Sequence, residues 1–218
     1  MKNPRISFIL PLLIVLLCAP TLSAQAAPDH ALLRRVDGHY NHLRSLRARY
    51  TEHYTGVGME RTESGTVTLK KPGLMRWSYD TPTGKLFVLD GKYAWFYTPG
   101  DAEVSRAPAR QLDDLRSPLR LLLGHTQLAK ELEQIATEPD GANFIITGVP
   151  KGMAQRVRLL TLIVAPSGAI QRMKLEETDG ATTEFTFTQI EEDIPLPPAE
   201  FTFTPPPGIP IVAAQPPI

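Results

Sequence analysis

Hydrophobic residues recur at helical spacing shortly after position 27 and then change period. Leu32, Leu33, Val36, Tyr40 and Leu43 define one apolar stripe, and Asp29 stands where an acidic residue favours a helix start. From about Ala48 the alternation becomes one residue in two. This order predicts a helix followed by strands.

Strand-like segments then follow one another, separated by turn residues. Val67 and Leu69 share one face of the first, and Pro72-Gly73 interrupts it. Asp90-Gly91 is a strong signal of a tight hairpin. Bulky side chains occupy every second position in the segments beside these turns. They are Met75, Trp77 and Tyr79 after the first turn, Phe87 and Leu89 before the hairpin turn, and Tyr93, Trp95 and Tyr97 after it.

The middle of the chain returns to a helical period. Ser117-Pro118 is typical of a helix start and Gly124 of a helix end, which predicts a short leucine-rich helix. A second helix is predicted from about Gln127 to Ile135, with Leu128, Leu132 and Ile135 on one face.

The second half is again strand-like. Strands are predicted over 144–147, 156–164, 170–178 and 182–190, and the proline-rich C-terminal end allows only an edge strand and an extended tail. Short turns favour antiparallel pairing, and no β-α-β units are present. The sequence therefore predicts one mainly β domain: an unclosed, strongly curved antiparallel barrel with helices against one face.

The N-terminal segment differs from the rest. Lys2 and Arg5 precede an apolar run, and Ala24-Gln25-Ala26 follows it, which is typical of a secretory signal peptide. We expect residues 1–26 to be removed and 27–218 to form the exported domain. Cys18, the single cysteine, would be removed with the signal peptide, so no disulfide or thiol chemistry is expected in the exported domain.

Charge and motifs argue against most other functions. Basic and acidic residues number 23 each, which disfavours nucleic-acid binding. No nucleophile, phosphate-loop or zinc motif is present, so no catalytic residue and no cofactor are expected. His39, His42 and His53 have no recognised ligand spacing, so no metal site is expected. The acidic clusters Asp113-Asp114 and Glu191-Glu192-Asp193 are interpreted as solvated surface.

The bulky apolar residues allow two interpretations, an ordinary core or the wall of a site for an apolar ligand. Three segments of the chain carry a resemblance to a known family: Gly65-Thr-Val-Thr-Leu-Lys-Lys-Pro-Gly-Leu-Met-Arg-Trp-Ser-Tyr79, Val88-Leu-Asp-Gly-Lys-Tyr-Ala-Trp-Phe-Tyr97, and Phe201-Thr-Phe-Thr-Pro-Pro-Pro-Gly208. In order and spacing they resemble the periplasmic outer-membrane lipoprotein carrier family, LolA.

This resemblance implies an unclosed barrel covered by a helical lid, around a hydrophobic cavity for the acyl chains of lipoproteins. It implies a periplasmic carrier, expected to be a monomer. The implied partners are acylated lipoproteins, an inner-membrane ABC-type release complex and an outer-membrane acceptor lipoprotein, with no nucleic acid.

The resemblance also assigns residues. The family's arginine that holds the lid closed falls on Lys71, which lacks the planar guanidinium fork. The implied ligand-binding residues are Leu69, Met75, Trp77, Tyr79, Phe87, Leu89 and Trp95, and the implied lid residues are Lys71, Leu119, Leu122 and Leu123. Three alternatives stay open: a relative that carries or senses another lipid-like ligand, a lipid hydrolase, and a structural envelope protein with a solid core.

Overall fold

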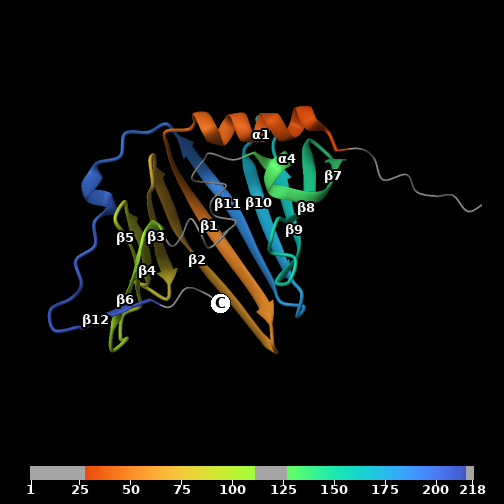
Figure 1. Ribbon diagram of the computed structural model, residues 1–218. Helices are drawn as coiled ribbons and strands as arrows, with labels where there is room; N and C mark the ends of the chain where they lie inside the picture. The colour runs from red at the N-terminus through yellow and green to blue at the C-terminus, as the bar shows by residue number, and fades with distance from the viewer. Residues whose placement is uncertain (1–27, 111–126, 215–218) are drawn as a thin grey trace, which may run out of the picture.

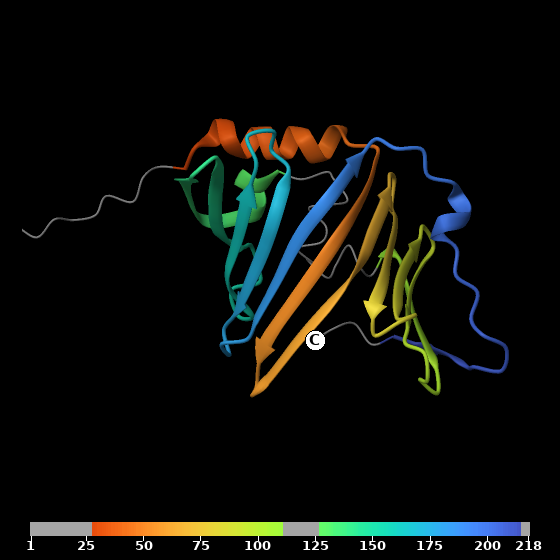
Figure 2. The same ribbon diagram turned by 180° about the vertical axis from the view of Figure 1, so that it is seen from behind.

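The computed structural model describes residues 28–110 and 127–214. They form one curved sheet with a helix across one end of its strands (Figures 1 and 2). The predicted signal peptide and the predicted leucine-rich helix lie outside the described residues. Within the described part of the chain, no helix is long and apolar enough to cross a membrane.

The helix α1 (His30–His42) begins where the sequence predicts. The Asp29 carboxylate accepts hydrogen bonds from the amides of Ala31 and Leu32, at 2.8 and 3.1 Å, and so satisfies donors that the first turn leaves free. The helix buries the predicted apolar stripe against the sheet. The Tyr40 hydroxyl also accepts a 2.9 Å hydrogen bond from the Ile170 amide, which fixes the helix over one strand end.

The sheet has twelve strands in the order β12-β6-β5-β4-β3-β2-β1-β11-β10-β9-β8-β7. β7 and β12 are its two edges, so the barrel is not closed. Among the described strands only β12 and β6 pair in parallel, and all other neighbours are antiparallel, as predicted. The strands are β1 (Ser45–Gly56), β2 (Met59–Lys70), β3 (Leu74–Thr81), β4 (Leu86–Asp90), β5 (Tyr93–Tyr97), β6 (Val104–Pro108), β7 (Leu132–Asp140), β8 (Asn143–Pro150), β9 (Val157–Val164), β10 (Ile170–Glu177), β11 (Thr182–Glu192) and β12 (Ile211–Ala213).

The predicted second helix is largely a strand. α4 (Leu128–Glu131) is a single turn, and β7 begins at Leu132. Gln134 adopts a positive φ of 52°, and the pairing register with β8 shifts there. Because this bulge adds one residue, Leu132 and Ile135 both pack on the core side although they stand three apart. A bulged strand thus reproduced the spacing of a helix.

The C-terminal segment runs along the outside of β3 to β6 and ends as the edge strand β12, as the prolines predict (Figures 1 and 2). It includes the short 3-10 helix η1 (Pro198–Phe201). The Glu200 carboxylate accepts bonds of 2.9 and 3.2 Å from Arg47, and Lys70 donates to the Leu196 carbonyl at 2.6 Å. These contacts hold the segment against the sheet.

Candidate functional site

One face of the sheet carries most of the predicted binding residues. Met75 lies opposite Leu69 on β2 and Leu89 on β4, and Trp77 lies opposite Phe87 on β4. Because cross-strand partners share a face, these residues form one surface, and Tyr79 continues it two positions further. All six belong to one hydrophobic cluster that also includes the apolar stripe of α1. The prediction that Met75, Trp77 and Tyr79 share a side is confirmed.

Trp77 lies at the centre of this face and is 2% exposed. Its ring makes edge contacts with Tyr50 on β1 and with Phe185 and Phe187 on β11, at centroid distances of 4.5, 5.6 and 6.5 Å. Its indole N–H lies 3.0 Å from the Met75 sulfur. Tyr50, Phe185 and Phe187 are not among the predicted binding residues, although each stands in an alternating segment of the chain.

Trp95 does not join this surface. It lies in a second cluster with Val88 and Val104, and its ring is 5.8 Å from Phe203 of the C-terminal segment. Its indole N–H donates a 2.7 Å hydrogen bond to the Asp90 carboxylate. The hairpin side that faces Trp77 is therefore the Phe87 and Leu89 side, and Trp95 packs beneath the C-terminal segment instead.

Lys71 lies between the end of β2 and the end of α1. Its amide donates a 2.9 Å bond to the Arg44 carbonyl, and its ammonium donates to the Tyr40 carbonyl in the last turn of α1. A cation is favourable at this end of a helix. Burial lowers the pKa of Lys71, and the Asp193 carboxylate opposes that shift. Lys71 thus joins α1 to the sheet, while the predicted lid residues Leu119, Leu122 and Leu123 lie outside the described residues.

The same face becomes ionic along β1 and β2 with increasing distance from α1. Glu63 is 5% exposed and receives the Lys85 ammonium at 2.7 and 2.8 Å. Arg61 lies 3.6 Å from both Glu52 and Glu63. Burial raises the pKa of Glu52, and the neighbouring Glu63 carboxylate adds to the rise, against the effect of Arg61 and Lys85.

The other candidate groups have structural partners. His39 lies 2.9 Å from a Glu192 oxygen, and Asp193 accepts a 2.8 Å bond from the Arg44 amide, so these two acids are paired rather than only solvated. Among the residues that the structure describes, no group of three or more His, Cys, Asp or Glu side chains could hold a metal ion. The cluster Asp113-Asp114 lies outside the described residues.

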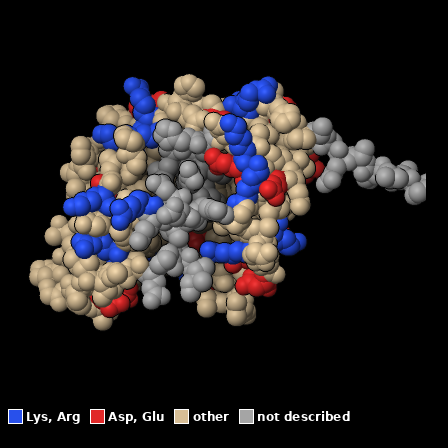
Figure 3. Space-filling view, viewed as in Figure 1, with Lys and Arg blue, Asp and Glu red and all other residues tan. Residues whose placement is uncertain are grey.

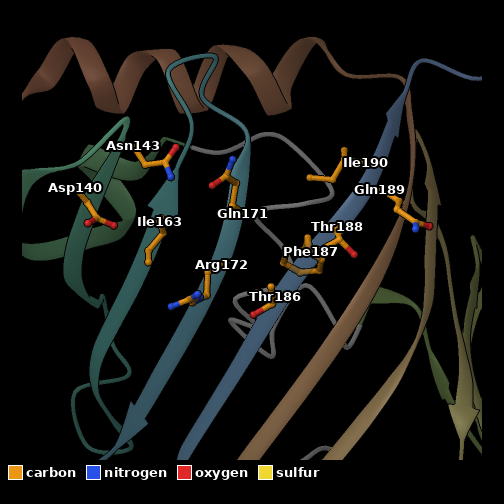
Figure 4. Close-up of a pocket in the computed structure, with 10 residues that line it drawn as sticks. All are labelled: Asp140, Asn143, Ile163, Gln171, Arg172, Thr186, Phe187, Thr188, Gln189 and Ile190. Carbon is orange, nitrogen blue, oxygen red and sulfur yellow. The ribbon is translucent and has the colours of Figure 1, made fainter.

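A separate groove of about 550 Å³ lies over β7 to β11. Figure 4 shows its lining, in which most residues are polar or charged, Gln171 and Gln189 among them. The register of β10 shifts beside Gln171, and Gln189 has a φ of 49°. None of the predicted binding residues lines this groove, although its lining includes Phe187 and Ile190, which also pack in the cluster of Trp77.

Charged side chains are not evenly spread over the molecule. On the face shown in Figure 3, Lys and Arg gather over the side formed by β3 to β6, whereas both signs mix over the opposite side. The chain as a whole is formally neutral. The two sides of the molecule therefore offer different electrostatic surfaces to a partner.

Comparison with known proteins gives a consistent result. The family model "Outer membrane lipoprotein carrier protein LolA" matches residues 41–204. An outer-membrane lipoprotein carrier protein of Nitrosospira multiformis is 30% identical over 155 residues, which are 70% of this chain and 73% of that protein. One of Chromobacterium violaceum is 27% identical over 218 residues, covering 94% of this chain and 99% of that protein.

A solved structure is also similar. It is an uncharacterized conserved protein from Thermus thermophilus, with a TM-score of 0.53 and 15% sequence identity, covering 84% of this chain and 98% of that one. At this identity the similarity shows the fold alone.

Proposed function

The chain belongs to the outer-membrane lipoprotein carrier protein family, LolA, and on that premise we propose that it binds the acyl chains of lipoproteins and shuttles these proteins from the inner to the outer membrane. Membership places it among lipoprotein carriers and not among enzymes. The acyl chains would contact the apolar face around Trp77, and no residue would have a catalytic role.

The observation that carries this proposal is the continuous apolar face of Leu69, Met75, Trp77, Phe87 and Leu89. Exposing an acyl chain of about 16 carbons to water costs ~0.8 kcal/mol per methylene, or roughly 12 kcal/mol in all. A protein that covers such a chain offsets this cost without covalent chemistry. The flexible thioether of Met75 suits contact with chains of varying shape.

Release requires that the carrier hold its cargo less tightly than the next acceptor does. If the empty protein is stabilised in a closed state, the cost of opening subtracts from the net affinity. Lys71 would stabilise the closed state, because it joins α1 to the end of β2. Leu119, Leu122 and Leu123 would supply the apolar side of the lid, and a lysine in place of the family arginine would hold the closed state less rigidly.

The same proposal includes location and partners. Residues 1–26 would direct export and be removed, and 27–218 would act in the periplasm as a monomeric single domain. An inner-membrane ABC-type complex would load the carrier, and an outer-membrane acceptor lipoprotein would unload it. The alternative is a protein of the same fold that carries or senses another lipid-like ligand, and it stays open because Lys71 departs from the family arginine.

The test combines two measurements on protein recovered from the periplasm. Native mass spectrometry reports what is bound, and release of lipoproteins from inner-membrane vesicles reports transfer. A stoichiometric acylated protein together with release supports the carrier. A bound free lipid without release supports the alternative, and an empty protein that releases nothing contradicts both.

A further inference from the structure

The apolar face changes character along the strands. Starting from the α1 end, the cross-strand pairs of β1 and β2 on this face are Leu46 with Leu69, Ala48 with Val67, Tyr50 with Gly65, Glu52 with Glu63, and Tyr54 with Arg61. Side chains therefore pass from aliphatic, through phenolic, to charged over the length of two strands. A surface with this gradient matches an amphiphilic ligand in one orientation only.

The charged end is unusual for the interior of a sheet. Glu52 and Glu63 are direct cross-strand partners, and two carboxylates in that position repel each other. Lys85 pairs with Glu63, and Arg61 lies 3.6 Å from each acid. The two negative and two positive charges cancel, so this end of the face favours neither an anionic nor a cationic head group. It marks a polar boundary to the apolar face.

Tyr50 lies at that boundary with an unused hydroxyl. The residue is 2% exposed, and its hydroxyl oxygen has no hydrogen-bond partner among the described residues. The Tyr79 hydroxyl lies close enough for a side-chain interaction between the two phenols to raise the pKa of Tyr50, but no hydrogen bond of regular distance and angle joins the two oxygens. Gly65 leaves room for the group, since a Cβ there would lie 2.9 Å from the hydroxyl oxygen. A buried hydroxyl without a partner is costly, so this group is available to donate a hydrogen bond to an acceptor on a bound ligand.

We propose that the Tyr50 hydroxyl donates a hydrogen bond to the carbonyl oxygen that ends a bound acyl chain. The chain then lies over the apolar face toward α1, and the ester or amide linkage lies beside the ion pairs of Glu63. The polar remainder of the cargo leaves toward the β1–β2 hairpin. This inference rests on the proposed function and adds to it an orientation and one specificity-determining residue.

A neutral carbonyl fits the chemistry better than a charged head group. The phenol is a donor that stays protonated, because burial, with the nearby Tyr79 and Glu52, raises its pKa. The surrounding charges already pair with one another. Every acyl chain ends in a carbonyl at its linkage, whereas an alkyl ether of the same length does not. The ester and the ether therefore differ in the feature that Tyr50 would recognise.

The experiment compares two synthetic lipopeptides, one with a di-O-acylglyceryl-cysteine and one with a di-O-alkylglyceryl-cysteine of equal chain length. Binding is measured by isothermal titration to the wild type, to Tyr50→Phe, and to Tyr97→Phe as a control in the second cluster beneath the C-terminal segment. The wild type should prefer the ester by about two- to tenfold, the range expected for one hydrogen bond. Tyr50→Phe should abolish the preference by weakening ester binding alone, and Tyr97→Phe should keep it.

Two results would overturn the inference: no ester preference in the wild type, or an undiminished preference in Tyr50→Phe. Failure of the wild type to bind either lipopeptide would instead overturn the proposed function, and the inference with it. Circular dichroism of each variant confirms that the fold is intact. A folded Tyr50→Phe variant that binds neither lipopeptide would also contradict the inference, because the ether contact does not need the hydroxyl.

Discussion

Replacing Gly65 with alanine should separate β2 from β3 beneath Tyr50. A Cβ at this position would lie 2.0 Å from the Ser78 carbonyl oxygen and 2.9 Å from the Tyr50 hydroxyl oxygen. The Tyr50 side chain can rotate away, but the Ser78 oxygen belongs to the backbone of the neighbouring strand. The sheet must therefore shift to admit the new methyl group.

The size of the effect follows from this geometry. Overpacking a well-filled interior costs typically about 1–3 kcal/mol, and a rigid backbone contact belongs at the upper end. We expect a loss of about 3 kcal/mol in the free energy of unfolding. With a urea m-value of about 2 kcal/mol/M, the midpoint should fall by roughly 1.5 M. Urea titration followed by far-ultraviolet circular dichroism measures this directly.

Gly38 provides the matched control. It lies within α1, and no heavy atom beyond its chain neighbours and the helix backbone would lie within 4 Å of an added Cβ. Because alanine is the better helix former, Gly38→Ala should raise the free energy of unfolding by about 0.5–1 kcal/mol. A Gly65→Ala protein less than about 0.5 kcal/mol below the wild type would refute the close approach of β2 and β3 on which the prediction rests.

Three further changes test other contacts. Asp29→Ala should lower the free energy of unfolding by about 1 kcal/mol, because the carboxylate caps α1; thermal unfolding measures this, and Asp29→Ser should recover most of the loss. Lys71→Met should speed hydrogen exchange in the last turn of α1 by about tenfold, since the bond to the Tyr40 carbonyl is lost; unchanged exchange would count against that contact. Phe203→Ala should lower stability by about 2 kcal/mol, because its half-buried ring packs on Trp95; an unshifted urea midpoint would show that the C-terminal segment contributes little.

Local chemistry made much of this fold predictable from the sequence. The cap at Asp29, the alternation through Met75, Trp77 and Tyr79, and the Asp90-Gly91 hairpin each depend on residues close together in the chain. The predicted unclosed antiparallel sheet is confirmed. These features are local because caps, strand faces and tight turns are each set within a few residues.

What the sequence left open depends on long-range pairing. Both strands of the Asp90-Gly91 hairpin alternate, so only the pairing of β4 with β3 shows that Phe87 and Leu89 share the face of Trp77. Trp95 is buried on the other side by Phe203, more than a hundred residues away. The bulge at Gln134 made a strand look helical. No local pattern contains any of these contacts.

The two tryptophans of the chain allow a direct measurement of whether acyl chains bind on the Trp77 face. Trp77 lies on that face and Trp95 lies in the second cluster, so Trp95→Phe and Trp77→Phe each leave one reporter. A lipopeptide with brominated acyl chains quenches indole fluorescence only on close contact. We predict strong, saturable quenching of Trp77 in Trp95→Phe and little quenching of Trp95 in Trp77→Phe. Equal quenching of Trp77 and Trp95, or no quenching of Trp77 while the lipopeptide is bound, would contradict acyl-chain binding on the Trp77 face.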